Sequence, residues 1–223
     1  MVNDARIQSA ARELHEEVWK HRHEFYPLGC NSVDLLHPRN AAVVLGYDYE
    51  EVPEIADWPP NRRMLIAGMV DPLRRRVVVS ESFEPAVMRF TGAHEIGHIV
   101  LDPPVRLLRE RPMDGPSEGR TGIERAADKF AALYLLPERL VWTELREGLG
   151  VGSPVTVDEN FAFWLDPNDH FGLLDAPLRA KSRALAACTR DVEGRHVVPL
   201  HERLGVSAAA LAIRLEEIGV IRG

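Results

Sequence analysis

Residues 85–101 read PAVMRFTGAHEIGHIVL, and the rest of the sequence is best understood from this stretch. The stretch is predicted to be a helix, because proline is tolerated in the first turn of a helix, where its missing N–H loses no partner. Pro103 and Pro104 should stop the helix just beyond Leu101. The last two turns are rich in apolar side chains, namely Ile96, Ile99, Val100 and Leu101. We therefore expect a buried helix and not an exposed one.

Two histidines lie four residues apart in this helix. Residues at this spacing share one helical face, with Cβ atoms about 5 to 6 Å apart, so His94 and His98 can reach one metal ion. Glu95 follows the first histidine and should project beside the ion, where a carboxylate can take a proton from a bound water. Zinc suits this chemistry because it lowers the pKa of such a water to roughly 7. We predict His94 and His98 as zinc ligands and Glu95 as the catalytic base.

A catalytic zinc ion needs a third protein ligand and an open fourth position. Glu124 is our candidate, because it opens a second predicted helix over residues 121–136. Asp128 lies one turn later on the same face, where its carboxylate can orient a ligand histidine through the free ring N–H. The alternative is a capping box over residues 121–124, in which Glu124 only satisfies backbone N–H groups at the helix start.

The composition is that of a globular protein, with 45% hydrophobic and 27% charged residues among 223, enough to fill a core. The net charge of -7 opposes non-specific attraction to the phosphates of nucleic acids. Two cysteines are too few for a disulfide framework. The N-terminus lacks the apolar run of a signal peptide, and no stretch approaches the ~18 apolar residues of a membrane span. We expect a cytoplasmic protein without membrane association.

Other elements are predicted around the two motif-bearing helices. Residues 64–70 and 75–80 are rich in β-formers and are separated by Asp71-Pro72-Leu73-Arg74, which predicts a hairpin. Residues 3–25 have the apolar spacing of an amphipathic helix. Residues 41–45 fit either a short helix or a strand, and residues 106–119 are predicted to be a mobile loop beside the site.

The predicted fold class is α+β, with a small β-sheet packed on the helix that carries the two histidines. We assign residues 1–150 to the catalytic domain, including a third helix after Pro137, and residues 151–223 to a mostly helical C-terminal segment. That segment ends in a helix-turn-helix-like pattern, broken at Gly205. Its last helix offers alanines and glutamates where a DNA reader carries Arg, Lys, Asn or Gln. A packing or substrate-docking module therefore fits it better than direct DNA binding.

The two motif-bearing helices resemble those of the ImmA/IrrE-type metallopeptidases. The active-site helix of that family has the form R-F-T-x-A-H-E-x-G-H, which residues 89–98 follow, and its second motif resembles E-x-x-A-N-x-F-A-A-x-x-L-x-P, which residues 124–137 follow. Gly92 stands where a larger residue is usual, and Asp128 replaces the commoner Asn, as in the thermolysin-like form E-x-x-x-D. The resemblance implies a zincin-like fold, with Glu124 as the third zinc ligand.

The resemblance also implies a substrate, because such proteins typically make a limited cut in a helix-turn-helix repressor or antitoxin and so switch on stress genes. We therefore expect a zinc-dependent metalloendopeptidase that makes a site-selective cut in a DNA-binding repressor. The alternatives are a regulator that binds zinc and a repressor without cutting it, and a hydrolase of non-peptide amides. Glu95 favours an enzyme over the first alternative, because a purely structural zinc site has four protein ligands and needs no base. His170 or Tyr134 could stabilise the oxyanion, but a loop residue and a core residue are the better interpretations, so neither is in the predicted catalytic set.

Overall fold

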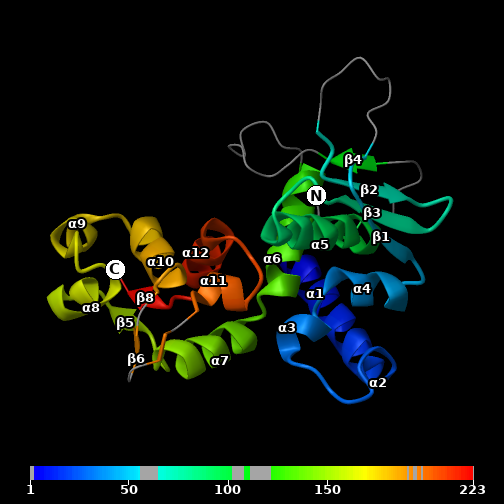
Figure 1. Cartoon of the computed structure of the whole chain (residues 1–223). Coiled ribbons are helices and arrows are strands. Elements are labelled where there is room, and N and C mark those ends of the chain that lie inside the picture. The colour runs from blue at the N-terminus through cyan, green and yellow to red at the C-terminus, as the bar shows by residue number, and fades with distance from the viewer. Residues whose placement is uncertain are drawn as a thin grey trace. The chain divides into compact units, whose positions relative to one another are not determined.

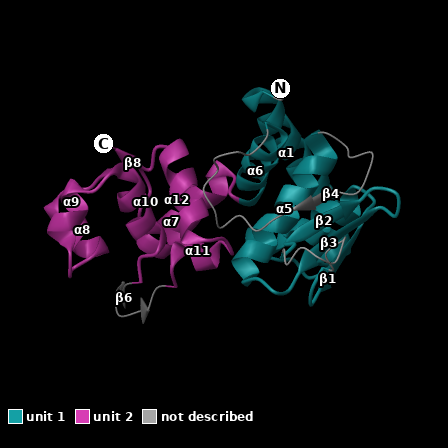
Figure 2. Cartoon of the chain, turned by 90° about the horizontal axis from the view of Figure 1, so that it is seen from above, with its two compact units in different colours: residues 1–135 teal, residues 136–223 magenta. Residues whose placement is uncertain are grey.

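A computed structural model describes residues 3–55, 65–101, 108–110, 122–189, 191–192, 195–196 and 198–222, with only the backbone described at 108–110, 191–192 and 195–196. The chain forms two compact units, residues 1–135 and 136–223 (Figures 1 and 2). The predicted α+β class is confirmed, since helices dominate and strands form small sheets. Within the described residues, no helix combines the length and apolar character that a bilayer span requires.

The first unit contains a four-stranded sheet of order β1-β3-β2-β4. β2 (Gly68–Asp71) and β3 (Arg76–Ser80) form the predicted antiparallel hairpin. The Asp71 carboxylate holds the turn by accepting hydrogen bonds from the backbone N–H groups of Leu73 and Arg74, at 3.1 and 3.0 Å. An aspartate that accepts from the backbone two and three residues later is a standard turn device, which explains why the hairpin could be predicted.

Two strands complete the sheet, and the sequence predicted neither of them. β1 (Asp48–Val52) pairs in parallel with β3, and β4 (Leu108–Glu110) pairs antiparallel with β2. The prediction of a loop is therefore wrong for residues 108–110, and the other residues of 106–119 lie outside the described residues. Both strands are at the edges of the sheet and carry many charged residues, so they lack the β-branched pattern of a buried strand.

The faces of the sheet follow from the alternation of the β3 valines. Val78 packs with Ile55 and Ile66 on one face. Val79 pairs with Gly68 across the two strands, so both residues face the same side of the sheet. A Cβ on Gly68 would meet α5 (Pro85–Leu101), which therefore covers this second face. The helix lies along β2 and β3, as Figure 1 shows. The predicted packing of the sheet on the histidine-bearing helix is thus present.

α6 (Gly122–Leu135) packs along α5, and Gly97 lies directly against it. A Cβ on Gly97 would lie 3.1 Å from the Ala127 Cα and 3.2 Å from the Ala127 carbonyl oxygen. A glycine at this position lets the two helices approach closely enough for their facing side chains to meet.

The other helices of the first unit surround this pair. α1 (Asp4–Lys20) contacts α6 and buries Ile7, Ala11, Leu14 and Val18. The predicted helix over 3–25 is divided, because α1 ends at Lys20 and a short α2 (Arg22–Phe25) follows. α3 (Ser32–Leu35) leads to α4 (Pro38–Val44), which contacts α5. The ambiguous residues 41–45 are thus mainly helical.

The second unit is mostly helical, as predicted for the C-terminal segment. Its helices are α7 (Glu138–Leu149), α8 (Glu159–Leu165), α9 (His170–Asp175), α10 (Leu178–Ala186), α11 (Leu200–Arg203) and α12 (Ala208–Glu217). β5 (Val155–Thr156) pairs in parallel with β8 (Ile221–Arg222), and β6 (Asp191–Val192) pairs antiparallel with β7 (Arg195–His196). α7 packs against α11 and therefore lies with the second unit, whereas the predicted domain boundary at residue 150 places it with the first.

The end of the chain has the predicted turn between two helices. Gly205 lies between α11 and α12 with a φ of 64°, a conformation that glycine adopts without strain. The Ser207 hydroxyl caps α12 by accepting a hydrogen bond from the Ala210 N–H at 3.1 Å. α12 buries Leu211 and Leu215 and packs on α10. Part of this helix thus belongs to the core of the second unit.

The approach of α5 to α6 predicts that Gly97→Val destabilises the first unit. The added side chain has no room against Ala127, so we expect the free energy of unfolding in urea to fall by about 1 to 3 kcal/mol, as overpacking typically costs. Gly122→Ala is the matched helical control, since no described atom lies within 4 Å of the Cβ it would add. Equal stability of the two variants would contradict the packing described here.

Candidate active site

α5 and α6 bring three metal-binding side chains to one point. His94 and His98, both almost completely buried on α5, have their Nε2 atoms 3.0 Å apart. From α6, the Oε2 atom of Glu124 lies 3.3 Å from the His94 Nε2 and 3.7 Å from the His98 Nε2. One donor atom from each residue lies within 4.8 Å of the others. The three predicted ligands are therefore close enough to bind a single metal ion.

Glu124 is in the first turn of α6 and turns its carboxylate toward both histidines. The alternative role in a capping box needs Thr121, which lies outside the described residues. A carboxylate near both imidazoles is placed as a third ligand would be. The ligand hypothesis thus gains a geometric basis that the sequence alone lacked.

Asp128 contacts the other side of the His94 ring. Its Oδ1 lies 2.8 Å from the His94 Nδ1. A carboxylate in this place accepts the Nδ1–H hydrogen bond, fixes the tautomer and leaves the Nε2 lone pair facing the cluster. Asp128 is thus within hydrogen-bond distance of His94, and its role in orienting the ring stays a prediction.

The electrostatics of the cluster favour a positive charge. Burial by itself lowers the pKa of His94, but hydrogen bonds to the Asp128 and Glu124 carboxylates outweigh burial and raise the pKa to about 10. The Glu95 charge acts in the same direction. Carboxylates that stabilise a proton on a buried imidazole also stabilise a cation at the same place. The side chains present therefore fit a divalent metal ion.

Glu95 is completely buried beside this cluster, against β2. A Cβ on Gly68 would lie 2.6 Å from the Glu95 Oε1 and 2.5 Å from the Thr91 Cγ2. Only a residue without a side chain lets the strand pass this close to the predicted base. Gly68 was not singled out in the sequence, although a glycine within a strand is a known sign of a close approach.

The two residues left out of the predicted site lie in different units. Tyr134 is completely buried in the first unit, with its ring stacked on Phe130 at a centroid distance of 6.0 Å. His170 begins α9 in the second unit, with its ring against Phe163 and Phe171. Tyr134 is therefore a core residue, and His170 is part of an aromatic cluster.

A His-Glu-x-x-His helix whose histidines meet a carboxylate from a following helix defines a metallopeptidase-type site. Residues 61–149 match the model of the Peptidase_M78 family, described as the IrrE N-terminal-like domain. The match confirms the resemblance inferred from the two motifs and implies a metallopeptidase-type function. It ends at residue 149, beyond the point where the compact units divide. No curated protein sequence matches the chain.

The ligand geometry predicts a ranking of variants in metal binding. Glu124→Ala removes a donor and should abolish stoichiometric zinc binding, whereas Asp128→Ala leaves the donors in place and should weaken binding about 10- to 100-fold, as loss of a ligand-orienting group does. Competition of each purified variant with a chromophoric chelator measures the affinity. If Glu124→Ala binds zinc like the unmodified protein, Glu124 only caps its helix and the third ligand is another residue.

Proposed function

We propose that this protein is a zinc-dependent metalloendopeptidase that makes a limited, site-selective cut in a protein partner. The observation that carries the proposal is the buried Glu95 carboxylate, next to a His94–His98–Glu124 cluster that supplies three donors without it. A site with a purely structural role has four protein ligands and no need of an acidic group in this place. The family match supports a peptidase-type reaction, and a zincin-like fold agrees with the sheet packed on α5.

Each residue of the site has a distinct part in the proposed reaction. His94, His98 and Glu124 would hold zinc, which when bound activates water and polarises the scissile carbonyl. Asp128 keeps the His94 ring oriented, through the 2.8 Å hydrogen bond. Glu95 would take a proton from the attacking water and return it to the leaving nitrogen.

The proposed partner is a DNA-binding repressor of the helix-turn-helix class or an antitoxin. The family resemblance is the first reason, and the net charge of -7 is the second, because a basic DNA-binding protein would be steered toward an acidic enzyme. Both proteins would then work in the cytoplasm, and cleavage of the repressor would switch on a stress response. Selectivity has to come from contacts outside the zinc site.

Glu95→Gln provides the direct test of the mechanism. The amide cannot accept the proton, whereas the three ligands are untouched, so the variant should keep stoichiometric zinc and the fold but lose cleavage. Co-expression with repressors encoded beside its gene, followed by mass spectrometry, should show one cut with the unmodified protein and none with the variant. Cleavage that persists in Glu95→Gln would refute the proposed mechanism.

Two controls separate selective cleavage from other activities. Unstructured casein should stay largely intact when incubated with the zinc-loaded enzyme, and its digestion at many sites would refute selectivity. A repressor that binds the unmodified protein but is never cut would point to a regulator without catalytic activity.

Gly68→Ala tests whether β2 positions the base. The methyl group would displace the Glu95 carboxylate, and small misplacements of a catalytic group can lower the rate by about 10- to 100-fold. We expect kcat to fall in this range and zinc affinity to stay near that of the unmodified protein, while the thermal midpoint of unfolding drops because the added Cβ also crowds the buried Thr91. Gly152→Ala is the control, because its added Cβ meets nothing closer than the Arg146 Nε at 3.5 Å. A loss of zinc affinity equal to the loss of rate would contradict a positioning role.

A further inference from the structure

The second unit contains a helical hairpin that the proposed catalytic role does not use. α8 and α9 pack against each other across the turn at Asp166, whose carboxylate accepts hydrogen bonds from the N–H groups of Asn168 and Asp169, at 3.0 and 3.2 Å. Asp158 caps α8 by accepting from the Phe161 N–H at 2.8 Å. The hairpin is thus an ordered surface, with its own local hydrogen bonds.

Aromatic side chains are exposed on this hairpin. Phe163 on α8 is 51% exposed and Phe171 on α9 is 64% exposed. The His170 ring bridges the two helices, with its centroid 5.3 Å from that of Phe163 and 4.1 Å from that of Phe171. A single exposed phenylalanine needs no explanation, but neighbouring aromatic rings in water are typical of binding sites.

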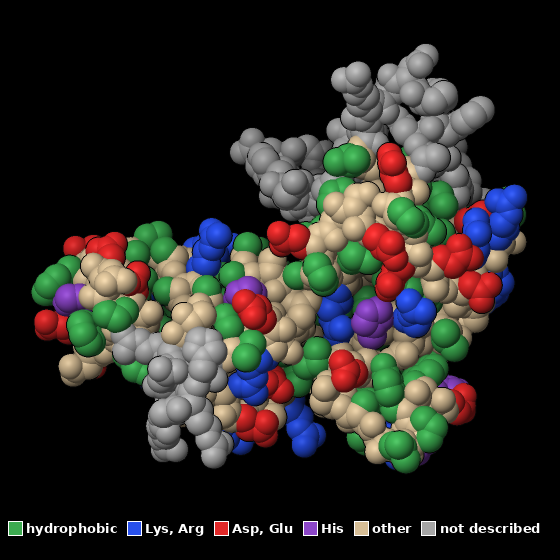
Figure 3. Space-filling model, in the orientation of Figure 1, with side chains coloured by type: hydrophobic (Ala, Val, Ile, Leu, Met, Phe, Trp, Pro, Cys, Tyr) green, Lys and Arg blue, Asp and Glu red, His purple; other side chains and the backbone are tan. Residues whose placement is uncertain are grey.

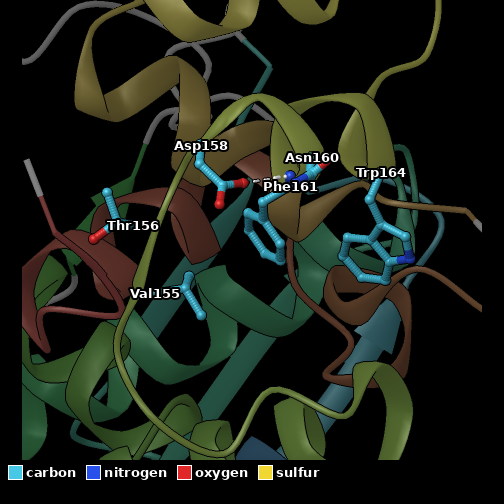
Figure 4. Close-up of a pocket in the computed structure, with 6 residues that line it drawn as sticks. All are labelled: Val155, Thr156, Asp158, Asn160, Phe161 and Trp164. Carbon is cyan, nitrogen blue, oxygen red and sulfur yellow. Dashed lines mark hydrogen bonds between the residues drawn. The ribbon is translucent and has the colours of Figure 1, made fainter.

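A hollow of about 380 Å³ lies on the same segment, between β5 and α8. Its lining consists of Val155, Thr156, Asp158, Asn160, Phe161 and Trp164, which Figure 4 draws as sticks. The rings of Phe161 and Trp164 are stacked, at a centroid distance of 5.3 Å. Two aromatic rings with one carboxylate and one carboxamide suit the side chain of a lysine or arginine, which can combine a cation–π contact with an ion pair.

The charge of residues 155–176 is strongly one-sided, and Arg222 on β8, the cross-strand partner of Thr156, is a basic residue beside them. Residues 155–176 contain no Lys or Arg, and their five acidic residues are Asp158, Glu159, Asp166, Asp169 and Asp175. On the face drawn in Figure 3, the side chains over α8 and α9 are mainly acidic and hydrophobic. Arg179 on the next helix is paired with Glu216 through two hydrogen bonds and does not offset this charge. This short segment therefore holds much of the excess negative charge of the chain.

We propose that the surface of α8, α9 and β5, residues 155–175, docks a basic amphipathic helix of the protein partner, with one lysine or arginine in the hollow. Such a helix presents an apolar face to Phe163 and Phe171 and cationic side chains to the surrounding carboxylates. A second copy of this chain would oppose like charges across the same contact, and nucleic acids or anionic membranes would be repelled. That the docked partner is also the substrate rests on the proposed function, whereas the binding of a basic helix does not.

The test measures the binding of a fluorescein-labelled, 18-residue helical peptide of Leu, Lys and Arg by fluorescence anisotropy. Zinc-loaded, full-length Glu95→Gln is used, so that cleavage plays no part. We expect saturable binding to this protein and at least a 10-fold higher Kd for the double variant Phe163→Ser and Phe171→Ser. A matched peptide with Glu in place of Lys and Arg should not bind, and a scrambled peptide of the same composition should bind less tightly.

Asp158→Asn tests the charge of the hollow separately from the fold. Asparagine keeps the cap of α8, so stability should be unchanged, whereas the Kd of the basic peptide should rise several-fold. Glu147→Gln on α7 is the matched control, an exposed acidic residue of the same unit outside the proposed surface. If the double serine variant fails to fold, Asp158→Asn and the peptide pair still decide the question.

Two outcomes would overturn the docking surface. Equal affinities of all variants, or equal losses in Glu147→Gln and Asp158→Asn, would mean that the peptide only responds to the overall charge. Self-association that the double serine variant abolishes would make the surface an interface between two copies of the chain. The failure of the proposed function is a separate result, because a protein that cuts no repressor can still bind the peptide.

Discussion

The close approach of α5 and α6 at Gly97 is the constraint on which the site depends. His94 and His98 are only two candidate donors, and the third candidate, Glu124, comes from a helix that lies within van der Waals distance of the first. A side chain at Gly97 would separate the two helices and carry Glu124 and Asp128 away from the histidines. The same contact is part of the hydrophobic core, since Ala127 and Phe130 are buried against it. The geometry of the cluster and the stability of the first unit therefore have one physical origin.

Much of the site could be predicted because its chemistry is tied to helical spacing. The interval of four residues in the first motif places His94 and His98 on one face, and the same interval places Asp128 one turn after Glu124. The position of Gly68 was not foreseen, because its role depends on a contact with α5 and not on its neighbours in sequence. The spacing of residues in the sequence shows which side chains share a helical face, but only the tertiary structure shows which segments pack against that face.

The fold was predictable to a different extent in its two parts. The β2–β3 hairpin has a turn held by Asp71 and three buried valines, and both signals are local. β1 and β4 pair with strands that are distant in the chain, and both carry charged residues. Their pairing therefore cannot be predicted from local sequence patterns. In the second unit, α8 and α9 have six or seven residues each, too short for a helical period to be recognised. Their caps at Asp158 and Asp169 were the available signals.

All three candidate ligands and the residue that orients His94 lie between residues 94 and 128, within the first compact unit. The second unit contributes none of these side chains. Metal binding is thus thermodynamically linked to the folding of the first unit. An ion held there would raise the unfolding temperature of that unit.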